Sequence, residues 1–154
     1  MRGTILEAWY EPADDFEGID GKKIHTPPTA RIYKETKYGT FYGEARAAEC
    51  DEDIANSWDG FHFAEIKCDI QAHKQKMKIM KERAQGISHA LRVVLSGNPD
   101  LVDDPVIVKM YRQETDAWKN YYKAKDDYEI LRDSYKSLCQ HIIAQRRKIR
   151  ENQN

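Results

Sequence analysis

The chain has 154 residues, of which 40% are hydrophobic and 33% are charged, and its formal net charge is −1. This length suits one domain, and the large share of charged residues predicts a thin core with an elongated part. The sequence has no run of about 18 apolar residues that could span a membrane, and its N-terminus does not resemble a signal peptide. We therefore expect a cytoplasmic protein.

The charges are distributed unevenly along the chain. Residues 1–66 carry 7 Lys/Arg and 14 Asp/Glu, a net charge of −7, whereas the remaining residues carry 18 and 12, a net charge of +6. An acidic head and a basic tail can bind each other within one molecule or across an oligomer, and the basic part can attract anions. The three cysteines, Cys50, Cys68 and Cys139, are an odd number at wide spacings, so we expect reduced thiols.

The first 60 residues predict a small β-rich head. The segments TILEAWY, ARIYKE and TFYGEARA alternate in polarity or are rich in β-branched and aromatic residues, and ETKYG reads as the turn between the last two. We expect a small antiparallel sheet from these segments. Between residues 11 and 29 the glycines, acids and prolines predict loops, with room for one short hairpin around Asp20 and Gly21.

Two long stretches of the remaining chain show the 3-4 spacing of apolar residues that is typical of a helical seam. The first seam contains Phe63, Ile66, Ile70, His73, Met77, Met80, Ala84, Ile87, Leu91 and Val94. The second contains Ile107, Met110, Glu114, Ala117, Tyr121, Ala124, Tyr128, Leu131, Tyr135, Leu138, Ile142, Gln145 and Ile149. His73 is interpreted as a polar residue of the seam rather than as a ligand or a base.

The boundary between the two helices is marked by residues that end and begin helices. Gly97 suits a left-handed C-terminal cap, and Pro99 cannot continue the first helix. Asp104 is a suitable N-cap for the second helix, and Pro105 suits its first position. The short connection predicts an antiparallel two-helix hairpin with coiled-coil-like packing.

The predicted fold is therefore α+β, with a small N-terminal antiparallel sheet in residues 1–60 followed by a long helical hairpin in residues 61–154. The helices are expected at about 61–96 and 104–151, and the whole chain is expected to form a single structural unit. A two-helix hairpin has one inner seam, yet four further apolar residues flank the second helix's seam: Trp118, Tyr122, Ile130 and Ile143. We therefore expect a homo-oligomer that forms through the helical seam.

The acidic cluster at residues 49–53 could be a metal site or a turn that joins the sheet to the helix. Its spacing differs from that of a calcium-binding loop, and a metal would need Cys50, the acids and His62 together. Asp51 or Asp53 can instead start a short turn. We expect a turn and no metal. The sequence contains none of the common catalytic motifs, so we also expect no enzymatic activity and no cofactor.

The middle of the chain resembles small proteins of phages that infect Gram-positive bacteria. The resemblance rests on Phe41, Gly43 and Ala45 in a strand, then Cys50 and Asp53, and then Gly60, Phe63 and Ala64 at the opening of a long helix. Proteins with this layout look like the anti-Thoeris family, which sequesters cyclic ADP-ribose signals of bacterial immunity without catalysis. The resemblance implies a counter-defence protein, present in the cytoplasm of an infected host, that captures a cyclic nucleotide between protomers. Lys67 stands where the family usually has an arginine.

The residues themselves offer candidates for such a nucleotide site. A phosphate needs Arg or Lys, and a base needs an aromatic face. Arg46, Trp58 and Lys67 lie close together in sequence at the junction of sheet and helix, and the basic end of the second helix could bring Arg146 and Arg147 to that junction. These five residues are the predicted ligand-binding residues.

Two other functions remain open from the sequence. The lysine-rich start of the first helix suits a single-stranded nucleic-acid-binding accessory protein of recombination, although the acidic head would repel a polyanion. The helical hairpin could also grip a host protein as an inhibitor.

Overall fold

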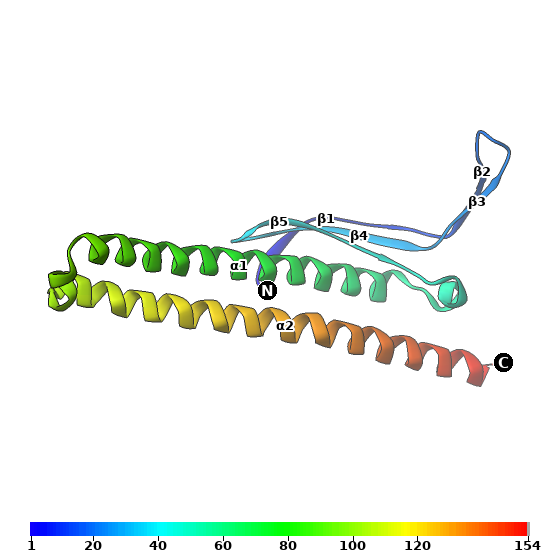
Figure 1. The fold of residues 1–154 in the computed structure, drawn as a ribbon. Helices are drawn as coiled ribbons and strands as arrows, with labels where there is room; N and C mark the ends of the chain where they lie inside the picture. The colour runs from blue at the N-terminus through cyan, green and yellow to red at the C-terminus, as the bar shows by residue number, and fades with distance from the viewer. Residues whose placement is uncertain (154) are drawn as a thin grey trace. The chain divides into compact units, whose positions relative to one another are not determined.

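The computed structural model describes residues 1–153 and confirms the predicted α+β fold, in which a small antiparallel sheet precedes two long helices that pack together (Figure 1). The elements are, in chain order, β1 (Gly3–Glu11), β2 (Asp14–Glu17), β3 (Lys23–Thr26), β4 (Thr29–Thr36), β5 (Gly39–Arg46), the 3-10 helix η1 (Glu49–Ile54), α1 (Ser57–Gly97), the 3-10 helix η2 (Pro99–Asp103) and α2 (Pro105–Gln153).

The main sheet has three antiparallel strands in the order β1-β4-β5, so β4 lies in the middle. Its register pairs Ile32 with Ala8 on one side and with Gly43 on the other. The chain between β1 and β4 forms a separate two-stranded hairpin from β2 and β3, whose turn contains Gly21 at a φ of 74°. Both the sheet and the short hairpin were predicted, and both predictions are confirmed.

One face of the main sheet packs on the first turns of α1. The residues of β4 alternate, and its buried side chains are Thr29, Ala30, Ile32, Lys34 and Thr36. Ile32 forms the core with Ala64 and Cys68 of α1, and Phe41, Ala45 and Phe61 pack against this cluster. Because these helix residues are small, the strands can approach the helix backbone closely.

Gly43 marks the closest approach between β5 and α1. A Cβ atom built at Gly43 would lie 2.0 Å from the carbonyl oxygen of Ala64 and 2.9 Å from Sγ of Cys68. No side chain larger than a hydrogen atom fits there unless the strand moves away from the helix. Gly43 is therefore required by packing, because its φ is not positive.

The buried face of the sheet also holds one charged side chain. The Lys34 side chain is 4% exposed, and its ammonium group donates to Glu65 at 2.7 Å and to Asp69 at 2.8 Å. Burial opposes the charge of Lys34, but the two carboxylates outweigh it and raise the pKa of this lysine. This charge cluster connects β4 to the third and fourth turns of α1.

The helix boundaries differ in part from those expected. α1 begins at Ser57, earlier than the expected residue 61, because Asn56 caps it by accepting a hydrogen bond from the Asp59 N–H at 2.8 Å. The N-cap of α2 is Asp104, as predicted, and it accepts a hydrogen bond from the Val106 N–H. The predicted left-handed cap at Gly97 is wrong: within residues 1–153 only Gly21 and Gly39 have positive φ, and the chain leaves α1 through η2 instead.

The chain divides into two compact units. The head unit contains residues 1–72 together with the chain from residue 131 onward, and the hairpin unit contains His73–Ile130. In the hairpin unit the two helices are joined by hydrogen bonds from Ser88 to Glu114 and from Trp118 to Ser88, and by an ion pair between Lys76 and Asp127. No helix within residues 1–153 combines the length and the apolarity needed to cross a bilayer.

Candidate functional site

The acidic cluster at residues 49–53 forms η1, a turn between the sheet and α1 that binds the end of α2. Within the head unit Arg146 pairs with Asp59, Arg147 with Asp51 and Arg150 with Asp53. We call these three ion pairs the arginine latch. The acidic head and the basic tail, which the sequence could place in one chain or in two, thus meet within a single chain.

The latch has the geometry of strong ion pairs. Nε and Nη2 of Arg146 lie 2.8 and 3.1 Å from the two carboxylate oxygens of Asp59, and the same atoms of Arg147 lie 2.7 and 2.8 Å from those of Asp51. Such two-point contacts fix both position and orientation. The hydrogen bonds from the two arginines lower the pKa values of Asp59 and Asp51.

Besides Asp51 and Asp53, which pair with arginines, η1 has a third acid with a side-chain partner, Glu52. Nε2 of His25, on β3, lies 2.7 Å from Glu52, and Nδ1 of the same ring lies 2.6 Å from Asp15 on β2. The hydrogen bond with Asp15, followed by that with Glu52, raises the pKa of His25. The carboxylates of Asp51, Glu52 and Asp53 therefore hold neighbouring elements, and residues 1–153 contain no group of three or more His, Cys, Asp or Glu side chains arranged to hold a metal ion.

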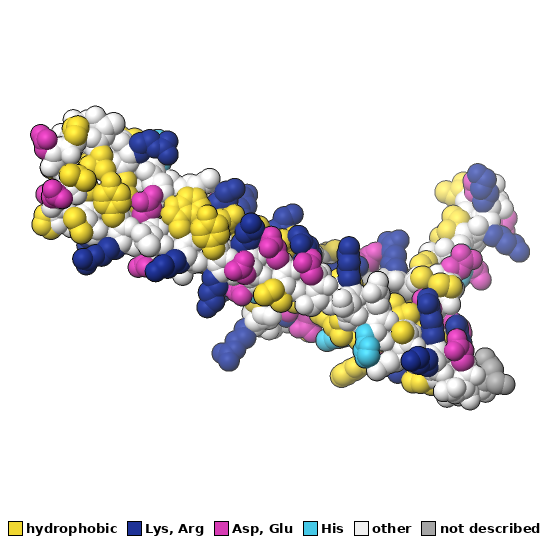
Figure 2. All heavy atoms as spheres, turned by 60° about the horizontal axis from the view of Figure 1, so that its bottom comes forward, with side chains coloured by type: hydrophobic (Ala, Val, Ile, Leu, Met, Phe, Trp, Pro, Cys, Tyr) yellow, Lys and Arg dark blue, Asp and Glu magenta, His cyan; other side chains and the backbone are white. Residues whose placement is uncertain are grey.

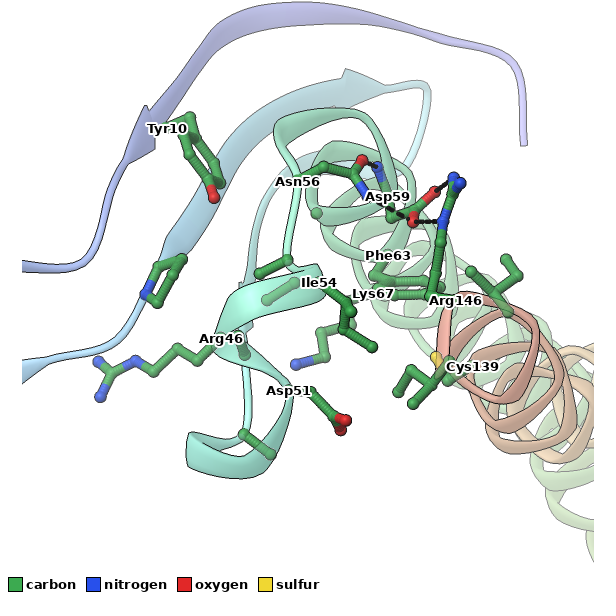
Figure 3. Close-up of a pocket in the computed structure, with 18 of the residues that line it drawn as sticks. Tyr10, Arg46, Asp51, Ile54, Asn56, Asp59, Phe63, Lys67, Cys139 and Arg146 are labelled. Carbon is green, nitrogen blue, oxygen red and sulfur yellow. Dashed lines mark hydrogen bonds and ion pairs between the residues drawn. The ribbon is translucent and has the colours of Figure 1, made fainter. Parts of the chain in front are cut away.

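Beside the latch, the head unit encloses a cavity of about 220 Å³. Its wall comes from the end of β1, the residue before β4, the end of β5 and the chain that follows it, η1, the first turns of α1 and the C-terminal part of α2 (Figure 3). Much of the lining is apolar or aromatic: Tyr10, Pro28, Ala45, Ala47, Ala48, Ile54, Ala55, Gly60, Phe63, Tyr135, Cys139, Ile142 and Ile143. The polar lining residues are Arg46, Asp51, Asn56, Asp59, Lys67 and Arg146.

Lys67 is the cation whose charge the cavity leaves uncompensated. Its ammonium group donates to the backbone carbonyl of Glu44 at 2.5 Å, and no carboxylate within residues 1–153 lies within ion-pair distance of it. An ammonium group has three protons, so one bond to a carbonyl leaves two for a ligand. By contrast, Arg146 at the same cavity is already bound by Asp59.

The contact with Glu44 also sets the direction of the Arg46 side chain. The Glu44 carboxylate accepts hydrogen bonds from the Tyr42 hydroxyl at 2.6 Å, from Arg31 at 3.0 Å and from Arg46 at 2.5 Å, and these contacts lower its pKa to about 2. The Arg46 guanidinium is thus tied to the outer face of the sheet, and Figure 3 shows it extending away from Lys67. Arg46 contributes to the rim of the cavity rather than to its interior.

The five predicted ligand-binding residues therefore have different places in the structure. Arg46, Lys67 and Arg146 line one cavity, as expected from their convergence on the junction. Arg147 lies outside the lining and holds Asp51, which is part of it. Trp58 is 80% exposed and does not line the cavity, so the structure does not bring it together with the other four.

Several residues of the cavity were not predicted, and the sequence contains only a weak signal for them. Tyr135 and Ile142 belong to the predicted seam of α2, where they read as core residues. Asp59 reads as part of a helix start, and nothing near it in sequence indicates a partner 87 residues away. Burial raises the pKa values of the Tyr135 hydroxyl and the Cys139 thiol, so both groups stay neutral at physiological pH.

Comparisons with protein-family models, with curated proteins and with solved structures found no match to this chain.

Proposed function

We propose that the chain is a non-catalytic binding protein that sequesters a cyclic nucleotide of the cyclic ADP-ribose type, and so acts as a phage counter-defence protein in the host cytoplasm. The observation that carries the proposal is the cavity itself. It brings an uncompensated lysine, two arginines and three aromatic side chains together from segments that are far apart in sequence. A cation for phosphate beside apolar and aromatic surface for a base is the combination that nucleotide recognition requires.

In the proposed complex Lys67 contacts the phosphate first. It offers free protons without the loss of an existing ion pair, whereas Arg146 would have to share its guanidinium between the phosphate and Asp59. An approaching phosphate dianion would compete with the Asp59 carboxylate for the same N–H groups. We therefore expect Lys67 to contribute most of the affinity for phosphate and Arg146 to contribute less.

The volume of the cavity limits how the nucleotide can bind. At about 220 Å³ it lies below the range of about 300–1,000 Å³ that is typical of pockets enclosing drug-sized ligands. The cavity can enclose one part of a nucleotide, such as the base between Tyr10, Phe63 and Tyr135. The rest of the molecule would then lie at the rim, where Arg46 is 60% exposed.

The proposal is tested by native mass spectrometry and isothermal titration calorimetry with cyclic ADP-ribose isomers and cyclic oligonucleotides. We expect the wild-type chain to retain one of them at a fixed ratio per protomer and to release it chemically intact on denaturation. Lys67→Met keeps the apolar stem but removes the charge, and should weaken binding at least tenfold, equivalent to about 1.4 kcal/mol. Lys74→Met is the matched control, because Lys74 is an exposed lysine of the same helix.

Three results would contradict the proposal. Retention of none of these ligands would exclude sequestration of that class, and equal losses in the Lys67 and Lys74 variants would show that the cavity is not the site. Binding of single-stranded nucleic acid that collapses with added salt would instead favour the nucleic-acid reading, because release of counterions makes such affinity strongly salt-dependent.

A further inference from the structure

The hairpin unit has a row of apolar and aromatic side chains on α2 that lies outside the seam between its own helices. The row is Val108, Tyr111, Trp118 and Tyr122, with the polar Thr115 in its middle, and its spacing alternates between three and four residues. Val108 is 37%, Tyr111 40% and Tyr122 57% exposed. Figure 2 shows hydrophobic side chains gathered on the surface toward the loop end of the helices. A 3-4 row is what one helix presents to another, so this row suits a further helix.

The aromatic members of the row support one another. The ring centroids of Trp118 and Tyr122 are 6.1 Å apart, and Tyr121, on the seam, lies 5.7 Å from Trp118 and 5.1 Å from Tyr122. The Trp118 indole N–H also donates to Ser88 at 3.1 Å. Rings that are already ordered lose little conformational entropy when a partner covers them.

Beside the aromatic row, α1 presents a basic row with the same spacing: Lys78, Lys81, Gln85, Ser88, Arg92 and Leu95. The hydrogen bond between Trp118 and Ser88 shows that the two rows adjoin each other. Lys78 lies 3.9 Å from Glu82 in its own helix, whereas Lys81 and Arg92 have no ion pair with any residue of the described chain. One face of the hairpin unit is therefore basic along α1 and aromatic along α2.

The hairpin unit buries few side chains by itself, and most of these are small. Its buried residues are Ala84, Leu91, Ile107, Ala117 and Ala124, and three of these five are alanines. Helices gain most of their stability in proteins by packing an apolar face, and two helices with such small core residues have little to pack. The exposed rings on α2 are the surface whose burial would add most to the stability of this unit.

We propose that this face is the interface of a homodimer, with a second copy of the chain as its occupant. In this arrangement the two-fold axis runs parallel to the helices, so that each basic row covers the partner's aromatic row. Neighbouring helices are then antiparallel, as in a four-helix bundle, and the interface is the same patch on both copies. Arg and Lys side chains pack their apolar stems on aromatic rings and place their charges over the ring faces.

The charges favour this arrangement over the other two-fold packing. If each helix packed on the same helix of the partner instead, Lys81 and Arg92 would face the partner's basic row, which contains no acid to compensate their charges. Ser88 and Trp118 lie at the same height along the helices, and a two-fold axis parallel to the helices keeps that height in the partner. Arg92 is one turn beyond Ser88, and Thr115 is about one turn from Trp118 in the same direction. The proposed axis therefore places the partner's Arg92 close to Thr115. A positive charge at Thr115 should therefore disrupt the dimer, and a negative charge at residue 92 should compensate for it.

The proposal is tested by sedimentation velocity and multi-angle light scattering on the full chain without any nucleotide. We expect a dimer for the wild type at tens of micromolar, and at least tenfold weaker association for Thr115→Arg. The matched control Asn120→Arg adds the same charge to the exposed opposite flank of α2 and should remain dimeric. The double variant with Thr115→Arg and Arg92→Glu should recover the dimer.

Each alternative result has a defined meaning. A monomeric wild type would overturn the proposal, as would equal dissociation of the Thr115 and Asn120 variants. If Thr115→Arg dissociates the dimer and Arg92→Glu fails to restore it, the packing of α1 on the partner's α2 is wrong. Helical circular dichroism of every variant shows whether it is folded. The outcome does not depend on the proposed nucleotide, since no residue of this face lines the cavity.

Discussion

Replacement of Gly43 by alanine should strongly destabilise the head unit. The added Cβ would lie 2.0 Å from the Ala64 carbonyl oxygen, whereas Cβ atoms in proteins essentially never approach closer than 3.0 Å. Because the neighbour is backbone, no side-chain rotation relieves the contact, and β5 must move from α1 by about 1 Å. That shift would loosen the packing of Ile32 and Cys68. Overpacking of a core costs about 1–3 kcal/mol, and we expect a loss of about 3 kcal/mol here.

Thermal unfolding followed by circular dichroism measures this loss. For a chain of about 150 residues, 1 kcal/mol shifts Tm by roughly 2–4 °C, so Gly43→Ala should lower it by roughly 6–12 °C. Gly86→Ala is the matched control, since a Cβ at this helical glycine meets nothing within 4 Å. That variant should be more stable by about 0.8–1 kcal/mol, because alanine favours the helix. A Gly43 variant that unfolds at or above the wild-type midpoint would refute the close approach of β5 to α1.

Three further predictions concern titratable groups of the head unit. The lowered pKa values of Asp51 and Asp59 mean that the latch contributes fully above the unfolded pKa of about 3.9 and is lost as the pH falls through the folded values. The protection factors of the amides of residues 143–150 against hydrogen exchange, which correct for the pH dependence of the intrinsic rate, should therefore stay constant from pH 5 to 8 and fall below about pH 4. The raised pKa of His25 means that its contacts stabilise the fold fully below about pH 6.5 and weaken as the pH rises through the pKa of the folded state. An NMR titration of His25 should give a midpoint above 6.5, and Glu52→Gln should lower it. A midpoint that Glu52→Gln leaves unchanged would contradict the contact. Cys50 is exposed and should react with a thiol reagent in the folded protein, whereas burial of Cys68 raises its pKa to about 11 and should delay its reaction until the chain unfolds.

The helical hairpin was predictable because mostly apolar residues repeat at the 3-4 spacing of a helical seam over several heptads. The second buried face of α1 was not predicted. Ala64, Cys68 and Ala72 recur every four residues and are fully buried, but small side chains give little hydrophobic signal. Only the contact with Gly43 and Ile32 shows that these residues lie under a sheet.

The candidate site was predictable only in part for a similar reason. Lys67 and Arg146 stand out as cations near a junction and near a helix end, and the structure places both at one cavity. Trp58 was expected beside them because it is close in sequence. It lies in the first turn of α1, where the cap at Asn56 and the pairing of Asp59 with Arg146 leave the indole on the outside. Side-chain direction at a helix start depends on the cap, which composition does not reveal.

The arginine latch has a consequence for the order in which the chain folds. Its ion pairs connect residues that are 87 to 97 positions apart. Closing a flexible loop of about 90 residues costs about 4 kcal/mol of entropy, and a single ion pair that water can reach returns only a part of this cost. The turn at η2 brings the two helices together with only a few residues. Pairing of the helices can therefore start at this turn and extend along them before the end of α2 reaches η1. The cavity wall that α2 supplies is therefore expected to assemble late, and slow formation of the arginine latch relative to helix formation would be its kinetic signature.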